Sequence, residues 1–157
     1  MRIQDYFVDK TRRAADEAFR YAAATPAEKL DWSPMDMGRS VLDICRELAM
    51  TPKWAFDTIE GVESDYSENA MAELRKMQAA WTTVEACKAK WEEHAMDFYE
   101  LVKNLPDSRL TETRWLPYEG GRDFTMIEML EYASWNCNYH AGQIAYIQIL
   151  LGDKEMH

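Results

Sequence analysis

Apolar residues recur at steps of three and four along residues 125–152, which read TMIEMLEYASWNCNYHAGQIAYIQILLG. That spacing places one apolar stripe along a helix and turns it toward a core. The stripe consists of Leu130, Ala133, Cys137, His140, Ile144, Ile147 and Leu151. Thr125 and Glu128 are spaced as a capping box, which predicts the start of this helix, and Gly152 predicts its end because glycine readily adopts a left-handed conformation.

The same periodicity predicts three more long helices, over residues 2–24, 40–61 and 82–104. Each begins or ends at a recognisable signal, such as Ser40 as an N-cap for the second. A capping box of Thr82 with Glu85 opens the third long helix. Residues 62–80 are weakly determined, and residues 67–78 could form a shorter helix.

Two irregular connections, residues 25–39 and 107–124, separate these helices. The second could form a short β-hairpin or remain a loop. Four long amphipathic helices without a convincing strand pattern predict an all-α fold, a four-helix bundle whose two long connections permit crossovers. The length of 157 residues suits one domain over residues 1–157.

Charge and composition narrow the possible functions. The chain carries 28 acidic and 18 basic residues, for a net charge of −10. This excess of negative charge argues against nucleic acid and anionic membranes as partners. No apolar run is long enough to span a bilayer, and the N-terminal residues are too charged for a signal peptide. Three cysteines without paired spacing indicate reduced thiols, so a cytoplasmic protein is expected.

Few side chains are candidates for chemistry. His140 could be a core histidine, or it could be a metal ligand or general base, and Asn136 one turn earlier would face the same way. Glu47 lies at the edge of an apolar helix face and could extend to water or enter a site. His94 lies between acidic neighbours on a polar face and is expected to be solvated. Cysteine catalysis by Cys137 is disfavoured because no group is placed to orient a neighbouring imidazole.

Three segments, PAEKLDWSP, SVLDICRELA and the residues 125–152 quoted above, resemble the DinB/YfiT-like superfamily. The portion YHAGQI followed by LLG is the most specific part of this resemblance. The resemblance implies a four-helix bundle, often dimeric, that holds a divalent metal between its second and fourth helices through three histidines.

Carried over position by position, the three metal positions fall on Glu47, Asn136 and His140, so one histidine of three is kept. An acid, an amide and an imidazole can still hold a Zn, Ni or Mn ion, although less firmly than three imidazoles. In the alternative, no ion binds and Glu47 bonds directly to Asn136 and His140.

The resemblance also implies a function. It suggests a metal-assisted transferase of thiols or a hydrolase, with Glu47 and His140 as catalytic residues. A small molecule or thiol would be the ligand and a homodimer the assembly. The alternative is a non-catalytic, metal-free bundle that binds a small ligand or serves as a dimeric structural protein.

Overall fold

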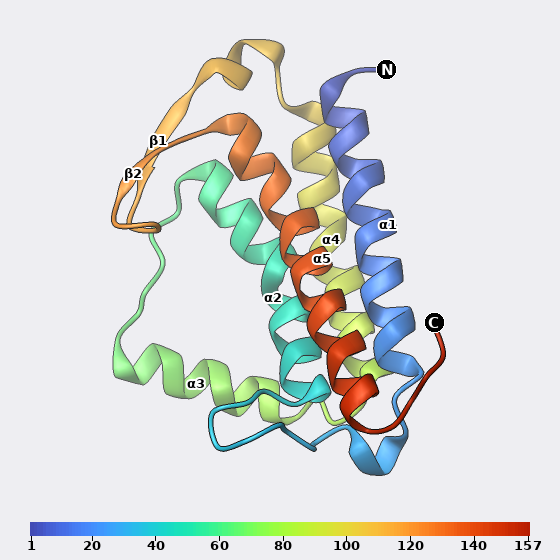
Figure 1. Ribbon diagram of the computed structural model, residues 1–157. Helices are drawn as coiled ribbons and strands as arrows, with labels where there is room; N and C mark the ends of the chain where they lie inside the picture. The colour runs from blue at the N-terminus through green and yellow to red at the C-terminus, as the bar shows by residue number, and fades with distance from the viewer.

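The computed structural model describes residues 1–157 and contains four long helices side by side. These are α1 (Ile3–Ala23), α2 (Val41–Glu60), α4 (Val84–Asn104) and α5 (Met126–Leu150). The shorter α3 (Glu68–Ala79) lies crosswise near one end of the bundle (Figure 1). Two 3₁₀ turns, Ala27–Lys29 and Asp107–Thr111, lie in the connections. The predicted all-α four-helix bundle is therefore confirmed.

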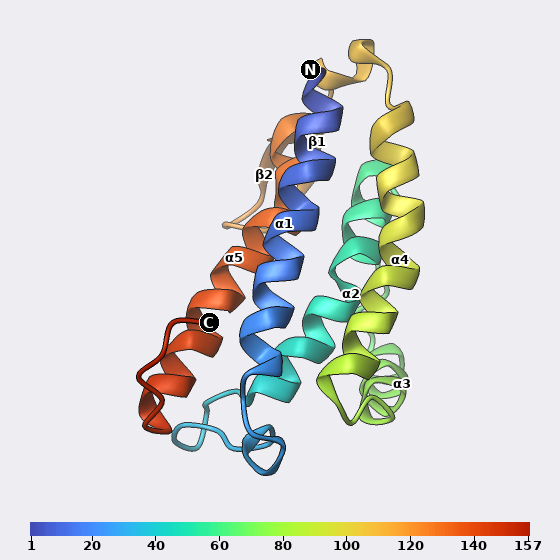
Figure 2. The same cartoon turned by 90° about the vertical axis from the view of Figure 1, so that its right-hand side faces the viewer.

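The helices do not alternate in direction along the chain. The α1 and α5 helices run the same way and pack together, and so do α2 and α4 (Figures 1 and 2). The α5 helix also packs against α2, which brings the two helices with the candidate residues into contact. Residues 61–83, which include α3, carry the chain back along the bundle so that α4 can start at the same end as α2.

Local signals set most helix ends as the sequence predicts. The side chains of Ser40 and Thr125 form capping boxes at α2 and α5. The α4 helix is an exception: its N-cap is Thr83, whose side chain accepts a hydrogen bond from the Ala86 amide, and not Thr82 as predicted. One residue of difference at a cap is common where two threonines adjoin.

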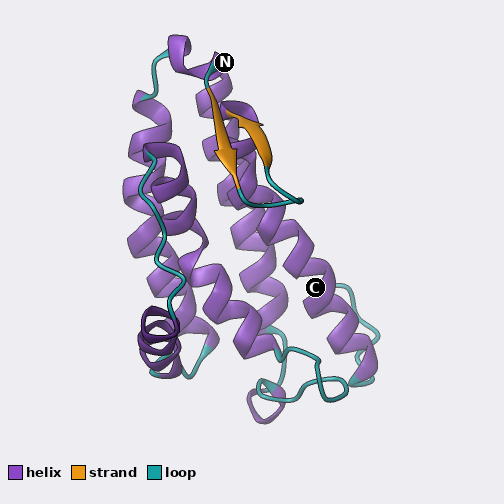
Figure 3. Cartoon of the chain, turned by 90° about the vertical axis from the view of Figure 1, so that its left-hand side faces the viewer, coloured by secondary structure: helices purple, strands orange, loops and turns teal.

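Residues 107–124 contain the β-hairpin that the sequence left open as an alternative. Strand β1 (Thr113–Leu116) pairs antiparallel with β2 (Arg122–Thr125), as Figure 3 shows. Arg109 and Arg114 both donate to the Ile59 carbonyl at the end of α2, at 3.0 and 3.3 Å. These contacts attach the hairpin region to the α2 end of the bundle.

The core lies between the four long helices. The residues of the predicted α5 stripe from Leu130 to Ile147 are buried, and Leu151 is half-buried. None of the helices combines the length and hydropathy that crossing a bilayer requires. The buried stripe includes His140, which is 2% exposed, and this places an imidazole inside the bundle beside α2.

Candidate functional site

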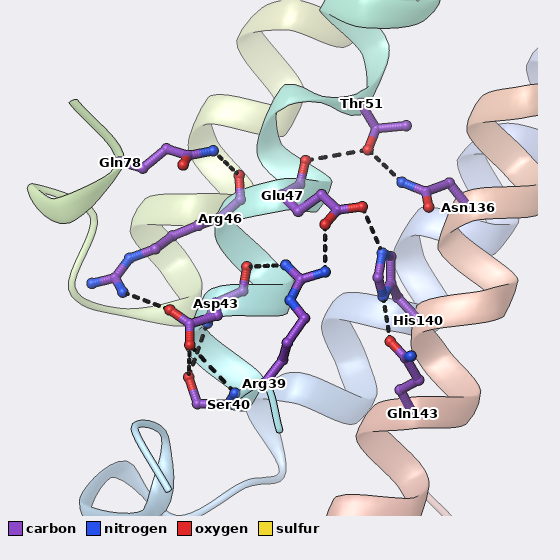
Figure 4. A network of polar contacts seen from close by, with 10 residues as sticks. All are labelled: Arg39, Ser40, Asp43, Arg46, Glu47, Thr51, Gln78, Asn136, His140 and Gln143. Atoms are coloured by element: carbon purple, nitrogen blue, oxygen red, sulfur yellow. Dashed lines mark hydrogen bonds and ion pairs between the residues drawn. The ribbon is translucent and has the colours of Figure 1, made fainter. Parts of the chain in front are cut away.

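Six polar side chains gather where α2 packs against α5 (Figure 4). We call this set the α2–α5 polar cluster, and its members are Arg39, Glu47, Thr51, Asn136, His140 and Gln143. The α5 members recur at steps of three and four, so one face of that helix presents them together. Two of the three predicted site residues, Glu47 and His140, meet directly here.

The contact between Glu47 and His140 joins the two helices. Oε1 of Glu47 lies 2.9 Å from Nε2 of His140, and Nδ1 of His140 lies 2.7 Å from Oε1 of Gln143. The ring of His140 therefore lies between the Glu47 carboxylate of α2 and the Gln143 amide of its own helix, and it bridges the α2–α5 contact.

Arg39 holds the other oxygen of Glu47. Its guanidinium forms an ion pair with Oε2 and also donates to the Asp43 carbonyl at 3.0 Å. Burial raises the pKa of Glu47, but the contacts with His140 and Arg39 lower it by more, so that it falls to about 2. The carboxylate thus stays ionised at neutral pH, with 29% of its side chain exposed.

Asn136 has a different partner from the one expected. Its Nδ2 donates to Oγ1 of Thr51 at 2.9 Å, and the Thr51 hydroxyl in turn donates to the Glu47 carbonyl at 3.2 Å. Glu47 is therefore bonded directly to His140 and not to Asn136. Oδ1 of Asn136 makes no hydrogen bond and is not fully enclosed, so it is free to accept one.

The remaining candidates lie outside this cluster. His94 is not solvated as predicted, because it is half-buried and its Nδ1 lies 2.8 Å from the Ala49 carbonyl. Cys137 is fully buried, and burial raises the pKa of its thiol. A thiolate nucleophile is therefore disfavoured at this position, in agreement with the sequence.

Sequence reasoning missed Arg39, Thr51 and Gln143. Gln143 follows His140 by three residues, so helix spacing could have identified it. Thr51 follows Glu47 by one helical turn and gives a similar, weaker signal. Arg39 lies in the irregular connection before α2, where no periodicity predicts the direction of a side chain.

Comparison with known proteins places this site in context. The model of the DinB family matches residues 3–157. No curated protein matches the sequence. Among solved structures, YfiT from Bacillus subtilis, described as a probable metal-dependent hydrolase with an unusual four-helix bundle topology, has a TM-score of 0.75 at 17% identity. That match covers 95% of this chain and 87% of YfiT.

Two further structures share the fold. A conserved protein from Enterococcus faecalis has a TM-score of 0.71 at 12% identity, covering 98% of this chain and 99% of that one. The colibactin self-resistance protein ClbS, solved in complex with double-stranded DNA, has a TM-score of 0.65 at 11% identity, covering 93% and 95%. A protein with this fold can therefore contact DNA. At identities of 11–12%, the similarity to this chain shows a shared fold and nothing about its partners.

Proposed function

Because the chain belongs to the DinB family, we propose that its α2–α5 polar cluster binds a divalent cation and works as a hydrolase or a thiol transferase on a small molecule. The ligands would be Glu47, Asn136 and His140. The observation that carries the proposal is the 2.9 Å separation of Glu47 Oε1 from His140 Nε2. Two atoms bound to one ion at about 2.1 Å and at a right angle lie about 3 Å apart, so a cation could replace the proton between them.

Gln143 supports this reading. Oε1 of Gln143 lies at Nδ1 of His140, so the ring directs Nε2 toward Glu47. The outer hydrogen-bond partner of a metal-bound histidine commonly orients the ring in this way. Oδ1 of Asn136 is the third available donor. When bound, a divalent ion supplies positive charge that lowers the pKa of water or of a thiol.

The available donor atoms limit how tightly the site can bind an ion. No group of three or more histidine, cysteine, aspartate or glutamate side chains is placed to hold an ion, so one donor must be an amide oxygen. Arg39 adds a positive charge next to Glu47. We therefore expect weaker binding than three imidazoles give, with Zn, Ni and Mn as the ions to test.

A second function follows from Arg39. With Arg39 on one oxygen of Glu47 and His140 on the other, the carboxylate is compensated without an ion. The cluster would then fasten α2 to α5 in a non-catalytic bundle that binds a small ligand. In either function we expect the homodimer that the family resemblance implies.

The two functions differ in metal binding. We would titrate tag-free protein with Zn²⁺, Ni²⁺ and Mn²⁺, measuring stoichiometry by calorimetry and proton release in weakly buffered solution. The background variant is His157→Gln, because His157 lies 2.6 Å from Asp153 and could bind metal adventitiously. One ion per chain with release of a proton near neutral pH supports the proposal.

Variants locate the binding. Glu47→Gln and His140→Gln should each abolish binding, and Asn136→Ala should weaken it about tenfold or more. His94→Gln is the matched control, since His94 contacts the Ala49 carbonyl and lies outside the cluster. Absence of binding at millimolar concentrations of all three ions would overturn the metal proposal and leave the metal-free function. Turnover assays with small esters, and with thiols plus electrophiles, then follow on the metal-loaded protein.

A further inference from the structure

Arg39 has more hydrogen-bonding capacity than its contacts within the chain use. A guanidinium carries five N–H donors. Nη1 donates to Oε2 of Glu47, and Nη2 donates to the Asp43 carbonyl at 3.0 Å. The N–H of Nε and one N–H on each terminal nitrogen therefore have no partner in the chain. The side chain is 40% exposed at the edge of the α2–α5 polar cluster, so a ligand can reach these donors from solvent (Figure 4).

The contact with Asp43 holds the guanidinium independently of Glu47. Arg39 lies just before α2, and Asp43 belongs to the first turn of that helix. The capping box of Ser40 with Asp43 fixes the backbone of this turn. Arg39 would therefore stay at the edge of the cluster if the Glu47 carboxylate took another partner.

A bound divalent ion would change the charge balance of the cluster. Without an ion, the positive charge of Arg39 and the negative charge of Glu47 cancel. Asp43, one helical turn before Glu47, already pairs with Arg46. An ion held by the three proposed ligands would therefore leave two positive charges in excess where α2 packs against α5. Uncompensated charge in a partly buried site is unfavourable, so an anion should accompany the ion.

We infer that Arg39 recognises the carboxylate of a small-molecule ligand that binds next to the ion. Two N–H groups of a guanidinium match the two oxygens of a carboxylate, which makes arginine the usual partner of that group. In this exchange Glu47 gives up Arg39 for the ion, and Arg39 pairs with the ligand instead. The inference narrows the substrate class of the proposed function to small carboxylates, and in that respect it rests on the proposed function.

The first test is the coupling between the ion and the anion. Calorimetric titration of the tag-free protein with the divalent ion would be repeated in the presence of acetate and of acetamide, which has a similar shape without the charge. Acetate should tighten ion binding by about fivefold or more, and acetamide should not. Arg39→Gln should lose the response to acetate. Because the chain has a net charge of −10, its surface as a whole does not attract an anion, so such a response is local.

Arg39→Gln also separates ligand recognition from a structural role. Without acetate, this variant should bind the ion about threefold or more tightly than the wild type, because a competing positive charge has left Glu47. If Arg39 only held the cluster together, its replacement would weaken ion binding. Arg39→Lys keeps the charge but not the paired donors, so it should lose most of the acetate response.

The matched control is Lys53→Gln. This variant also removes one positive charge from α2, at an ion pair with Asp57 that does not involve the cluster. It should resemble the wild type in ion affinity and in its response to acetate. An effect as large as that of Arg39→Gln would overturn the inference, since net charge alone would then explain the coupling.

The second test needs no ion. Glu47→Gln removes the negative charge that Arg39 balances, as a bound ion would, while the Asp43 carbonyl still holds the guanidinium. This variant should bind acetate saturably, with an affinity on the order of millimolar, as NMR chemical shifts would show. The wild type without an ion should not, and neither should Glu47→Gln combined with Arg39→Gln. Helical circular dichroism verifies that each variant is folded.

The outcomes distinguish this inference from the proposed function. If no ion binds to the wild type, the metal-dependent function fails, and acetate binding by Glu47→Gln decides whether Arg39 recognises a carboxylate. If an ion binds and acetate leaves its affinity unchanged, the metal site stands and the inference is overturned. Absence of acetate binding to folded Glu47→Gln, or binding that persists without Arg39, would also overturn it.

Discussion

Asn136 and Thr51 are hydrogen-bonded across the α2–α5 contact, with 2.9 Å between Nδ2 and Oγ1. Both side chains are buried, at 3% and 0% exposure. The Thr51 hydroxyl donates a hydrogen bond to the Glu47 carbonyl. The Asn136 side chain is thereby linked to the backbone of Glu47, the residue whose carboxylate contacts His140. The polar cluster is therefore connected through α2 even though Asn136 does not touch the Glu47 carboxylate.

Thr51→Val should destabilise the protein. The substitution keeps the shape of the side chain but removes the acceptor of a buried amide N–H, which costs about 1–3 kcal/mol. Chemical denaturation measures the loss. Thr58→Val on the same helix is the control, since Thr58 is half-buried and makes no side-chain hydrogen bond, and its effect should stay within about 0.5 kcal/mol. Equal effects of the two variants would contradict the prediction.

Glu47→Gln should change how stability depends on acid. Since the pKa of Glu47 is lowered from an ordinary value of 4.5 to about 2, its contribution is complete above about pH 4.5 and is lost as the pH falls toward 2. We expect the wild type to exceed Glu47→Gln by about 1–3 kcal/mol at pH 6, and this gap to shrink toward pH 2.

Thermal or urea unfolding between pH 2 and 7 measures this gap. Glu63→Gln is the control, because Glu63 is exposed and forms no ion pair. A gap between wild type and Glu47→Gln that stays constant with pH would show that the carboxylate contributes nothing as an ion.

Gly61→Ala should weaken the attachment of the hairpin. Gly61 has a φ of +78°, and a Cβ there would lie 1.7 Å from Nη1 of Arg114. Nη2 of the same guanidinium donates to the Ile59 carbonyl. The backbone strain costs about 1–2 kcal/mol, and the displaced arginine should add about 1 kcal/mol.

Gly152→Ala is the matched comparison at the end of α5. Its φ is +91°, but an added Cβ meets nothing within 4 Å, so only the strain remains. Hydrogen exchange of β1 and β2 should accelerate in Gly61→Ala alone. Unchanged exchange in the hairpin would mean that Arg114 does not attach it to α2.

The chain should not bind duplex DNA, although ClbS was solved with it. With a net charge of −10, phosphate contacts would have to overcome general repulsion. Fluorescence anisotropy with a labelled duplex at about 50 mM salt should show no binding up to tens of micromolar protein. Saturable binding that weakens as salt increases would contradict the expectation.

The fold was predictable because its information is local. Apolar spacing and capping residues such as Ser40 and Thr125 define the helices, and their side chains cap α2 and α5 as expected. The relative directions of the helices could not be predicted in the same way. No local signal in residues 61–83 indicates that they lead the chain back to the other end of the bundle. Pairing between helices depends on contacts between distant segments, which periodicity does not encode.

The site was predictable only in part. The resemblance identified Glu47, Asn136 and His140, and the first and last of these meet directly. The partner of Asn136 was not foreseen, because a threonine inside a helix usually bonds to its own backbone. The prediction for His94 was wrong for a related reason: its acidic neighbours suggested solvent, whereas the Ala49 carbonyl on α2 lies within its reach.

Pro52 lies inside α2 and cannot donate to the carbonyl of Leu48, four residues earlier. The residues on either side of Leu48 receive side-chain hydrogen bonds, at Glu47 from Thr51 and at Ala49 from His94 of α4. The backbone of α2 next to this interruption is therefore held by two side chains, one from α2 itself and one from α4. The His94 contact fastens α4 to α2 at the level where the hydrogen-bond ladder of α2 is interrupted, so loss of that imidazole would loosen the pair of helices at this level.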